Sequence, residues 1–187
     1  MLDKYTCLQK LAARRTDELF VTTMSVSVPW SRLSDGPFDF GAVDSAMGHG
    51  AAIAHGLALA QPRRRVIALN GDGSTLMGLG GLVTIAQYPA PNLTLVITEN
   101  GTYEVTGSQP VPGAGIVDYA AIARGAGIAE VYTIETEAQF DELLPRHFSG
   151  PGPTVMVWKI ARSNEPVPKF EQSVRDRGRR MRQALVV

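Results

Sequence analysis

The stretch VIALNGDGSTLMGLGGLVTIAQYPAPNLTLVITENGTY, residues 66–103, decides the fold. Two short and almost continuously hydrophobic runs, Arg65–Asn70 and Asn92–Thr98, have the pattern of strands that are buried on both faces of a parallel sheet. Between them, Ser74–Tyr88 is expected to form a helix, which the prolines after it end. A strand, a helix and a second strand in this order indicate a right-handed crossover between two parallel strands.

The rest of the chain continues this alternation of helices and strands. Residues 28–44 are rich in turn-forming residues, and the Gly- and Pro-rich segment Glu99–Gly115 is expected to be a long functional loop. We expect helices over Asp3–Arg15, Met47–Ala60, Asp118–Gly125 and Glu137–Phe148, strands over Glu18–Thr23, Glu130–Ile134 and Thr154–Ile160, and a basic closing helix that ends near Leu185.

These elements predict an α/β fold with a doubly wound, mainly parallel sheet of about six strands and with helices on both faces. The length of 187 residues predicts one domain over residues 1–187, in which residues 164–187 form a C-terminal arm and helix.

The composition excludes several classes of protein. Lys and Arg number 18 and Asp and Glu number 18, so the chain has no overall positive charge of the kind that is usual in nucleic-acid-binding domains. A single cysteine, Cys7, excludes an internal disulfide, a Cys-rich zinc site and a four-thiolate iron–sulfur cluster, and it suits a reducing cytoplasm. No hydrophobic run reaches the roughly 18–20 residues that span a bilayer, and no secretory signal pattern is present. We therefore expect a cytoplasmic protein without a nucleic-acid or membrane partner.

Polar residues follow two neighbouring strands of the predicted sheet, at the edge where open α/β sheets bind ligands. Asp72 lies between Gly71 and Gly73, which let the backbone turn sharply and a ligand approach closely. Asn100 follows the next strand, so a carboxylate and a carboxamide oxygen would lie side by side, a donor set that suits Mg²⁺. Ser74 and the amides that begin the next helix could hold phosphate oxygens. A lone Gly-Asp-Gly is more often an ordinary turn, but the order of the surrounding elements favours a ligand site.

The stretch quoted above resembles the thiamine diphosphate fingerprint, in which Gly-Asp-Gly is followed at a set interval by Asn. The resemblance extends upstream to MGHGAAIAHGLALAQPRRRV, residues 47–66, and covers the chain from Glu18 to Lys169. Within that family the chain is similar to the diphosphate-binding half of the sulfopyruvate and phosphonopyruvate decarboxylases, through NGTYEVTGSQ at 100–109 and PVPKF at 166–170. The resemblance implies the thiamine diphosphate-binding fold, with thiamine diphosphate and Mg²⁺ as cofactors.

The resemblance also implies a metal and diphosphate site. Mg²⁺ would be held by side-chain oxygens of Asp72 and Asn100 and by the backbone carbonyl of Thr102. Around the diphosphate and its metal, the cofactor-binding residues would be Gly71, Gly73, Ser74 and Tyr103. Glu99 stands before Asn100 where the family commonly has Asn or Asp, a departure that leaves the metal site intact.

The pyrimidine and thiazolium rings would be held by a different part of the chain. Met47 stands where the family places an apolar wedge that forces the cofactor into a V shape, and the main chain of Ser45 and Met47 would bind the pyrimidine edge. The loop VTTMSVS, residues 21–27, corresponds to the first diphosphate-contacting loop, with Thr22, Thr23 and Ser25 as candidates. That loop lacks the usual Asn-Ile-Gly, which weakens the substrate assignment more than the cofactor assignment.

The implied activity is decarboxylation of a small 2-oxo acid, because thiamine diphosphate serves as the electron sink when CO₂ leaves. The family also needs a glutamate against the pyrimidine ring, and this glutamate belongs to a pyrimidine-binding domain for which a chain of this length has no room. We therefore expect a carboxy-lyase subunit that is inactive alone, works with a separate pyrimidine-binding subunit, and forms a homodimer or hetero-oligomer. The alternatives are an acetolactate synthase-like carboligase half and a non-catalytic thiamine diphosphate-binding or assembly subunit; the single cysteine disfavours a 2-oxo acid:ferredoxin oxidoreductase.

The remaining conspicuous residues have less specific interpretations. Small residues of the Met47–Ala60 helix are expected to meet a second chain, and the arginines of the closing helix are expected to dock a partner subunit. Glu104 could act as a base, although it is expected to be an exposed loop carboxylate. We expect a surface role for His49, a packing role for His55 and a helix-dipole role for His147. Arg63–Arg65 is expected to form a solvated turn. Tyr103 and Gln109 border the predicted active loop and are candidates for substrate contact.

Overall fold

The computed structural model describes residues 1–41, 47–163 and 173–185. Within these ranges one sheet has the order β2-β1-β3-β4-β8-β7, and every neighbouring pair of strands is parallel. Its strands are β1 (Leu19–Thr22), β2 (Asp39–Gly41), β3 (Val66–Gly71), β4 (Leu93–Glu99), β7 (Glu130–Ile134) and β8 (Thr154–Lys159). The predicted α/β fold with a parallel sheet is confirmed.

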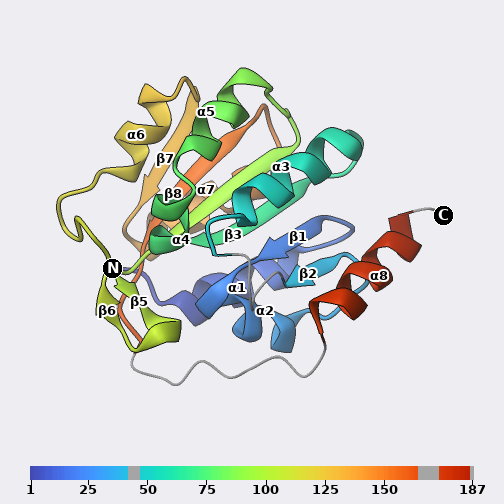
Figure 1. The fold of residues 1–187 in the computed structure, drawn as a ribbon, viewed down its shortest axis with the longest axis horizontal. Coiled ribbons are helices and arrows are strands. Elements are labelled where there is room, and N and C mark those ends of the chain that lie inside the picture. The colour runs from blue at the N-terminus through green and yellow to red at the C-terminus, as the bar shows by residue number, and fades with distance from the viewer. Residues whose placement is uncertain (42–46, 164–172, 186–187) are drawn as a thin grey trace.

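Helices cover both faces of this sheet (Figure 1). One face carries α3 (Gly50–Ala60), α5 (Gly80–Gln87) and α6 (Tyr119–Gly125), and the other carries α1 (Lys4–Arg14), α2 (Ser27–Leu33) and α7 (Glu137–Phe148). The basic helix α8 (Val174–Leu185) packs beside the edge strand β2 and ends at Leu185 as predicted, whereas most of the predicted arm lies outside the described residues. None of the helices in the described ranges is long and apolar enough to span a bilayer.

The sheet has a hydrophobic core on each side because successive side chains of a strand point to opposite faces. In β3, Val66 and Ala68 pack into the core beneath α3 and α5, while Ile67 and Leu69 pack into the core beneath α1 and α2. All four side chains are fully buried. Full burial of one aliphatic side chain contributes roughly 1.5–3 kcal/mol, which explains why a strand of this composition occupies the centre of the sheet.

Two helices begin where polar side chains satisfy their first backbone amides. The Asp3 carboxylate accepts a hydrogen bond from the Thr6 amide at 2.7 Å, which confirms Asp3 as the cap of α1. At α7, the Thr136 hydroxyl accepts from the Gln139 amide while the Gln139 side chain accepts from the Thr136 amide, so the two residues form a capping box. Both helices pack on the face of the sheet that contains Trp158.

The interpretation of residues 28–44 as turns is wrong for the part that is described. This segment contains α2 and the edge strand β2, which is the strand that the sequence pattern missed. Trp30 of α2 is fully buried and donates a hydrogen bond from its indole nitrogen to Asp39 of β2 at 2.7 Å, and Asp39 also pairs with Arg15. Tertiary contacts of these three residues, rather than a local periodicity, therefore order the segment.

The single helix predicted over Ser74–Tyr88 is also wrong, because the structure has two helices there. A short helix α4 (Asp72–Met77) ends at Gly78, and α5 begins at Gly80. The break brings Gly78 so close to Gly48 that a Cβ on Gly78 would collide with the backbone oxygen of Gly48. The helix predicted from Met47 begins only at Gly50, and Met47–His49 form a turn against α4.

The long loop predicted over Glu99–Gly115 is partly ordered into a small hairpin. Strands β5 (Thr102–Tyr103) and β6 (Gln109–Pro110) pair antiparallel and flank the 3₁₀ turn η2 (Glu104–Thr106). Gly107 between them has φ 109°, a left-handed conformation that glycine adopts without strain.

The solvated turn expected over Arg63–Arg65 is wrong for Arg65. Its guanidinium donates hydrogen bonds to the Thr94 hydroxyl at 2.9 Å, to the Pro91 carbonyl at 3.1 Å and to the Gly150 carbonyl at 3.0 Å. Burial is the main cause that lowers the pKa of Arg65 to about 10, and the nearby charge of Arg146 acts in the same direction. Arg65 thus fastens two loops to the amino end of the sheet, opposite the edge that carries the predicted site.

Candidate active site at the carboxyl ends of the central strands

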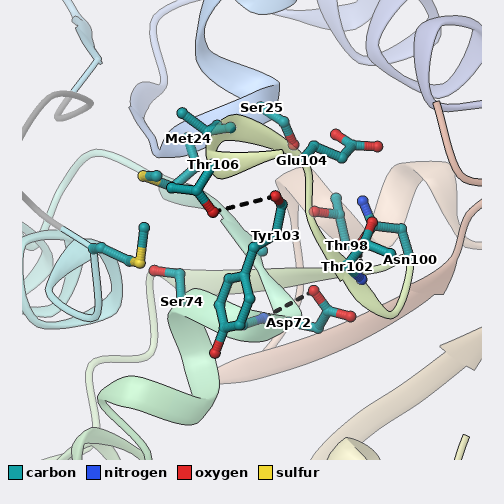
Figure 2. Close-up of a pocket in the computed structure, with 14 residues that line it drawn as sticks. Met24, Ser25, Asp72, Ser74, Thr98, Asn100, Thr102, Tyr103, Glu104 and Thr106 are labelled. Carbon is teal, nitrogen blue, oxygen red and sulfur yellow. Dashed lines mark hydrogen bonds between the residues drawn. The ribbon is translucent and has the colours of Figure 1, made fainter. Parts of the chain in front are cut away.

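A pocket lies at the carboxyl ends of β3 and β4 (Figure 2). Its walls come from the β3–α4 junction, the loop after β4 and the 3₁₀ turn η1 (Met24–Val26) that follows β1. The lining residues are Met24, Ser25, Met47, Gly71, Asp72, Gly73, Ser74, Thr98, Asn100, Thr102, Tyr103, Glu104, Val105 and Thr106.

Asp72 connects the ends of the two central strands. It is the first residue of α4, directly after β3, and it is almost fully buried. One carboxylate oxygen accepts from the Gly73 amide at 2.8 Å, and the other accepts from the Gly101 amide, beyond the end of β4, at 2.7 Å. Burial raises the pKa of Asp72, and these backbone amides oppose that effect. The structure therefore holds the carboxylate at the point that the sequence predicted.

Asn100 and Thr102 shape the other wall of the pocket. The Asn100 side-chain oxygen accepts from the Thr102 amide at 2.8 Å, which closes a tight turn around Gly101, whose φ is 72°. Thr102 is more than nine-tenths buried, and its hydroxyl has no hydrogen-bond partner among the described residues. Buried polar atoms without a partner are uncommon in native structures, and this one belongs to a residue of the pocket wall.

Tyr103 lies directly against Gly73. A Cβ on Gly73 would collide with the Tyr103 ring, so only glycine lets the aromatic ring pack on this piece of backbone. Figure 2 shows the ring in front of the first turn of α4, between Ser74 and Asp72. Tyr103 therefore covers the backbone of Gly73. The sequence analysis predicted that both residues bind the diphosphate end of the cofactor.

The Met47 turn is fastened to α4 by a hydrogen bond from the Gly48 amide to the Ser74 hydroxyl, at 3.0 Å. This bond brings Met47 into the pocket wall beside Ser74. Ser45, the other residue that was expected to bind the pyrimidine, lies outside the described residues. The wedge role of Met47 remains a prediction, although its position in the pocket is compatible with that role.

The first predicted phosphate loop contributes some of the expected residues to the pocket wall, but not all of them. Thr23 is buried, and its hydroxyl donates to the Asn70 side-chain oxygen at 2.8 Å, inside the β1–β3 contact. Thr22 is also buried and, like Thr23, does not line the pocket, whereas Ser25 does. Met24, which the sequence analysis did not select, also lines the pocket and has φ 52°, a left-handed conformation that costs a residue with a side chain roughly 1–2 kcal/mol.

Glu104 is not the exposed carboxylate that was expected. Its side chain is 3% exposed and forms an ion pair with Lys4 of α1, with an Nζ–Oε2 distance of 2.9 Å. Lys4 lies 100 positions away in the chain, so no local pattern could have indicated the contact. The expectation of an exposed Glu104 is therefore wrong, and the residue becomes part of the pocket wall.

The three histidines are not among the residues that line the pocket. His49 is exposed, and His55 bonds through Nε2 to the Tyr88 carbonyl at 2.7 Å, which agrees with the expected packing role. His147 is fully buried, and burial lowers its pKa to about 4. The expected dipole interaction of a charged imidazole at that helix end is therefore wrong, because the ring is neutral.

Comparison with known proteins establishes the family of the chain. Residues 36–158 match the family model of the thiamine pyrophosphate enzyme, C-terminal TPP binding domain. This chain belongs to the thiamine pyrophosphate enzymes. It is 34% identical over 172 residues to sulfopyruvate decarboxylase subunit beta from Methanothermobacter thermautotrophicus. These residues are 91% of this chain and 89% of that protein.

Two further relatives of this thiamine pyrophosphate enzyme are much longer than the chain. Benzoylformate decarboxylase from Pseudomonas aeruginosa is 36% identical over 147 residues, which are 71% of this chain and 27% of that protein. The crystal structure of benzoylformate decarboxylase from Polynucleobacter necessarius matches with a TM-score of 0.75 at 21% identity, covering 88% of this chain and 34% of that chain. The structural match shows a shared fold.

The donors in the pocket of this thiamine pyrophosphate enzyme are hard oxygen atoms. Within the described ranges there is no group of three or more His, Cys, Asp or Glu side chains that could hold a metal ion. A metal in this pocket would therefore rest on a mixed set: one carboxylate from Asp72, one carboxamide oxygen from Asn100 and backbone carbonyls. Such a set, completed by water or phosphate oxygens, fits Mg²⁺.

Proposed function

We propose that this chain is the diphosphate-binding subunit of a thiamine diphosphate- and Mg²⁺-dependent decarboxylase that acts on a small 2-oxo acid similar to sulfopyruvate or phosphonopyruvate. The observation that carries the proposal is the Asp72 bridge between the ends of β3 and β4. It lies in a chain that matches a sulfopyruvate decarboxylase beta subunit over 91% of its length. When bound, thiamine diphosphate supplies the electron sink into which the carbon–carboxylate bond breaks.

Asp72 and Asn100 hold Mg²⁺ through their side-chain oxygens in this proposal, and Thr102 holds it through its backbone carbonyl. Each oxygen that now accepts one backbone hydrogen bond retains a second lone pair for a metal. The unpartnered Thr102 hydroxyl lies in the same wall and supports the assignment of this wall to a polar ligand. The donor set thus fits the metal.

The diphosphate contacts the Gly73 backbone and Ser74, beside Gly71. Because the Tyr103 ring packs on Gly73, the ring leaves this position when phosphate oxygens reach the Gly73 backbone. The chain's own contribution is therefore to hold the anionic end of the cofactor and to cover it with the Tyr103 loop. Ser25 extends the same wall from η1.

Met47 supports the cofactor rings from the turn before α3, and the main chain of Ser45 and Met47 binds the pyrimidine edge. The glutamate that activates the cofactor comes from a separate pyrimidine-binding subunit. Two relatives that align with most of this chain support this division, because both are beta subunits of sulfopyruvate decarboxylase. The chain alone is therefore expected to bind the cofactor weakly and to release no CO₂.

Titration calorimetry with thiamine diphosphate, with and without Mg²⁺, tests the site. We expect wild-type binding to require Mg²⁺, and Asp72→Ala to reduce the affinity by at least about ten-fold because it removes a metal ligand. Asp17→Ala is the matched control, since Asp17 forms an exposed ion pair with Arg64 outside the pocket and its loss should leave binding unchanged. Binding that is equally strong without Mg²⁺, or unchanged in Asp72→Ala, would refute the site.

A CO₂-release assay with sulfopyruvate, phosphonopyruvate and pyruvate tests the reaction. The assay is run on the chain alone and on the chain together with the protein that co-purifies with it from its source. We expect release only from the pair. Turnover by the chain alone would overturn the split-subunit proposal. CO₂ release accompanied by a condensation product, in place of the free aldehyde, would favour the carboligase alternative.

A further inference from the structure

The Lys4–Glu104 ion pair is buried almost completely, with side chains that are 4% and 3% exposed. Removal of two charges from water is costly, and a hydrophobic pair of similar volume is often at least as stable. The other ion pairs in the described ranges leave at least one side chain more exposed than either of these. Core stability alone is therefore a poor explanation for a charged pair at this position.

The Glu104 carboxylate joins four segments of the chain. It belongs to η2, it pairs with Lys4 of α1, it accepts from the Ser163 amide after β8 at 3.2 Å, and it is hydrogen-bonded to the Ser25 side chain of η1. Figure 2 shows Glu104 and Ser25 together at one end of the pocket. Two walls of the pocket thus meet at one carboxylate.

The position of Lys4 is fixed by backbone pairing rather than left to a loose terminus. Leu2 bridges to Ile160 in parallel register, the Leu2 amide donates to the Lys159 carbonyl at 2.8 Å, and the Ala161 amide donates to the Leu2 carbonyl at 2.9 Å. The Lys4 ammonium group therefore contacts Glu104 from the start of α1, which the Leu2 pairing attaches to the sheet.

The charge of Lys4 also affects which ligands the pocket can bind. Asp72 and Glu104 are two carboxylates in the wall of one pocket, and the proposed ligand of that pocket is an anionic diphosphate. An uncompensated Glu104 would repel this ligand, since like charges in a site of low dielectric interact strongly. Lys4 supplies the compensating charge.

We propose that Lys4 and Glu104 are a positioning pair: together they hold the loop from Thr102 to Thr106 against η1, and Lys4 neutralises the pocket carboxylate so that a diphosphate can bind. This inference rests on the proposed function for the ligand, whereas the part that concerns the loop is independent of it. Neither side chain takes part in the chemistry of the reaction.

The test compares Lys4→Met, Glu104→Gln and the double variant, with thiamine diphosphate and Mg²⁺ as the calorimetric probe. Lys4→Met should weaken binding at least about ten-fold because it leaves a buried carboxylate unpaired. The double variant should recover most of that loss, since it removes both charges. Lys10→Met is the matched control, because Lys10 also lies in α1 but pairs on the surface with Asp141. Wild-type affinity in Lys4→Met, or a double variant that binds no better than Lys4→Met, would overturn the charge role.

Amide hydrogen exchange without cofactor separates the inference from the proposed function. Exchange over residues 102–106 should accelerate at least about ten-fold in Lys4→Met and stay unchanged in Lys10→Met. Unchanged exchange in Lys4→Met would overturn the positioning role even if the cofactor binds. If wild type fails to bind thiamine diphosphate, the proposed function fails, and the exchange result still decides the positioning role. Should Lys4→Met not fold, the double variant replaces it in the exchange comparison with wild type.

Discussion

His147 is predicted to make the stability of the fold depend on pH. The ring is fully buried in α7, its Nδ1 lies 3.0 Å from the Leu143 carbonyl, and its Nε2 accepts a hydrogen bond from the Trp158 indole nitrogen at 3.1 Å. Both nitrogens are thus satisfied in one neutral tautomer, whereas a second ring proton would point at the indole N–H. Burial is the main cause that lowers the pKa of His147 to about 4, and the charge of Arg65 acts in the same direction.

The magnitude follows from the difference between the two states. An unfolded histidine has a pKa of about 6.5, so between pH 6.5 and pH 4 the unfolded state binds a proton that the folded state does not. The folded pKa is depressed, so the stabilisation is fully present above pH 6.5 and is lost as the pH falls toward 4. Each pH unit in this window is worth about 1.4 kcal/mol per proton, which gives a total on the order of 3 kcal/mol.

Urea denaturation of wild type and His147→Gln at several pH values between 4 and 7.5 measures this effect. Carboxylates titrate in both proteins, so they cancel in the difference, and only wild type should lose the additional stability of roughly 3 kcal/mol. Parallel curves of unfolding free energy against pH would refute the reasoning. An NMR titration of the wild-type imidazole provides a check that needs no variant: a pKa near 6.5 for His147 would contradict the buried neutral ring.

Two further substitutions have matched controls in the chain. In urea denaturation, Gly78→Ala should lower the free energy of unfolding by about 1–3 kcal/mol, because the new Cβ collides with the Gly48 backbone oxygen and displaces the Met47 turn. Gly80→Ala is the control: its Cβ meets open space, so the substitution should be neutral or slightly stabilising. Arg65→Met should lower the free energy of unfolding by about 3 kcal/mol, because it leaves the Pro91 and Gly150 carbonyls at the amino end of the sheet without donors. Arg63→Met, on the exposed surface, should change the free energy of unfolding by less than about 0.5 kcal/mol.

The parts of the structure that could be predicted are those in which local pattern and burial agree. Val66–Gly71 and Leu93–Glu99 are continuous hydrophobic runs that end in polar residues, so the parallel strands and the place of Asp72 at their carboxyl edge followed from the sequence alone. The capping residue Asp3 was predictable for the same reason, because a cap acts within one helical turn.

The parts that could not be predicted depend on contacts between distant residues. The edge strand β2 is short and is ordered by the contacts of Asp39 with Trp30 and Arg15. The break at Gly78 is imposed by the approach of Gly48, which no helix propensity records. The environment of Glu104 could not be predicted because its partner Lys4 lies 100 positions away in the sequence.

The amino terminus also has a practical consequence for handling the protein. Terminal residues usually fray, and their deletion is usually tolerated. Here a trimmed variant that begins at Tyr5 would lose both the Leu2 bridge to Ile160 and the partner of the Glu104 carboxylate, so a cut far from the pocket in sequence would reach its wall. Met1 is 86% exposed, so an affinity tag joined ahead of Met1 by a flexible linker leaves these contacts in place.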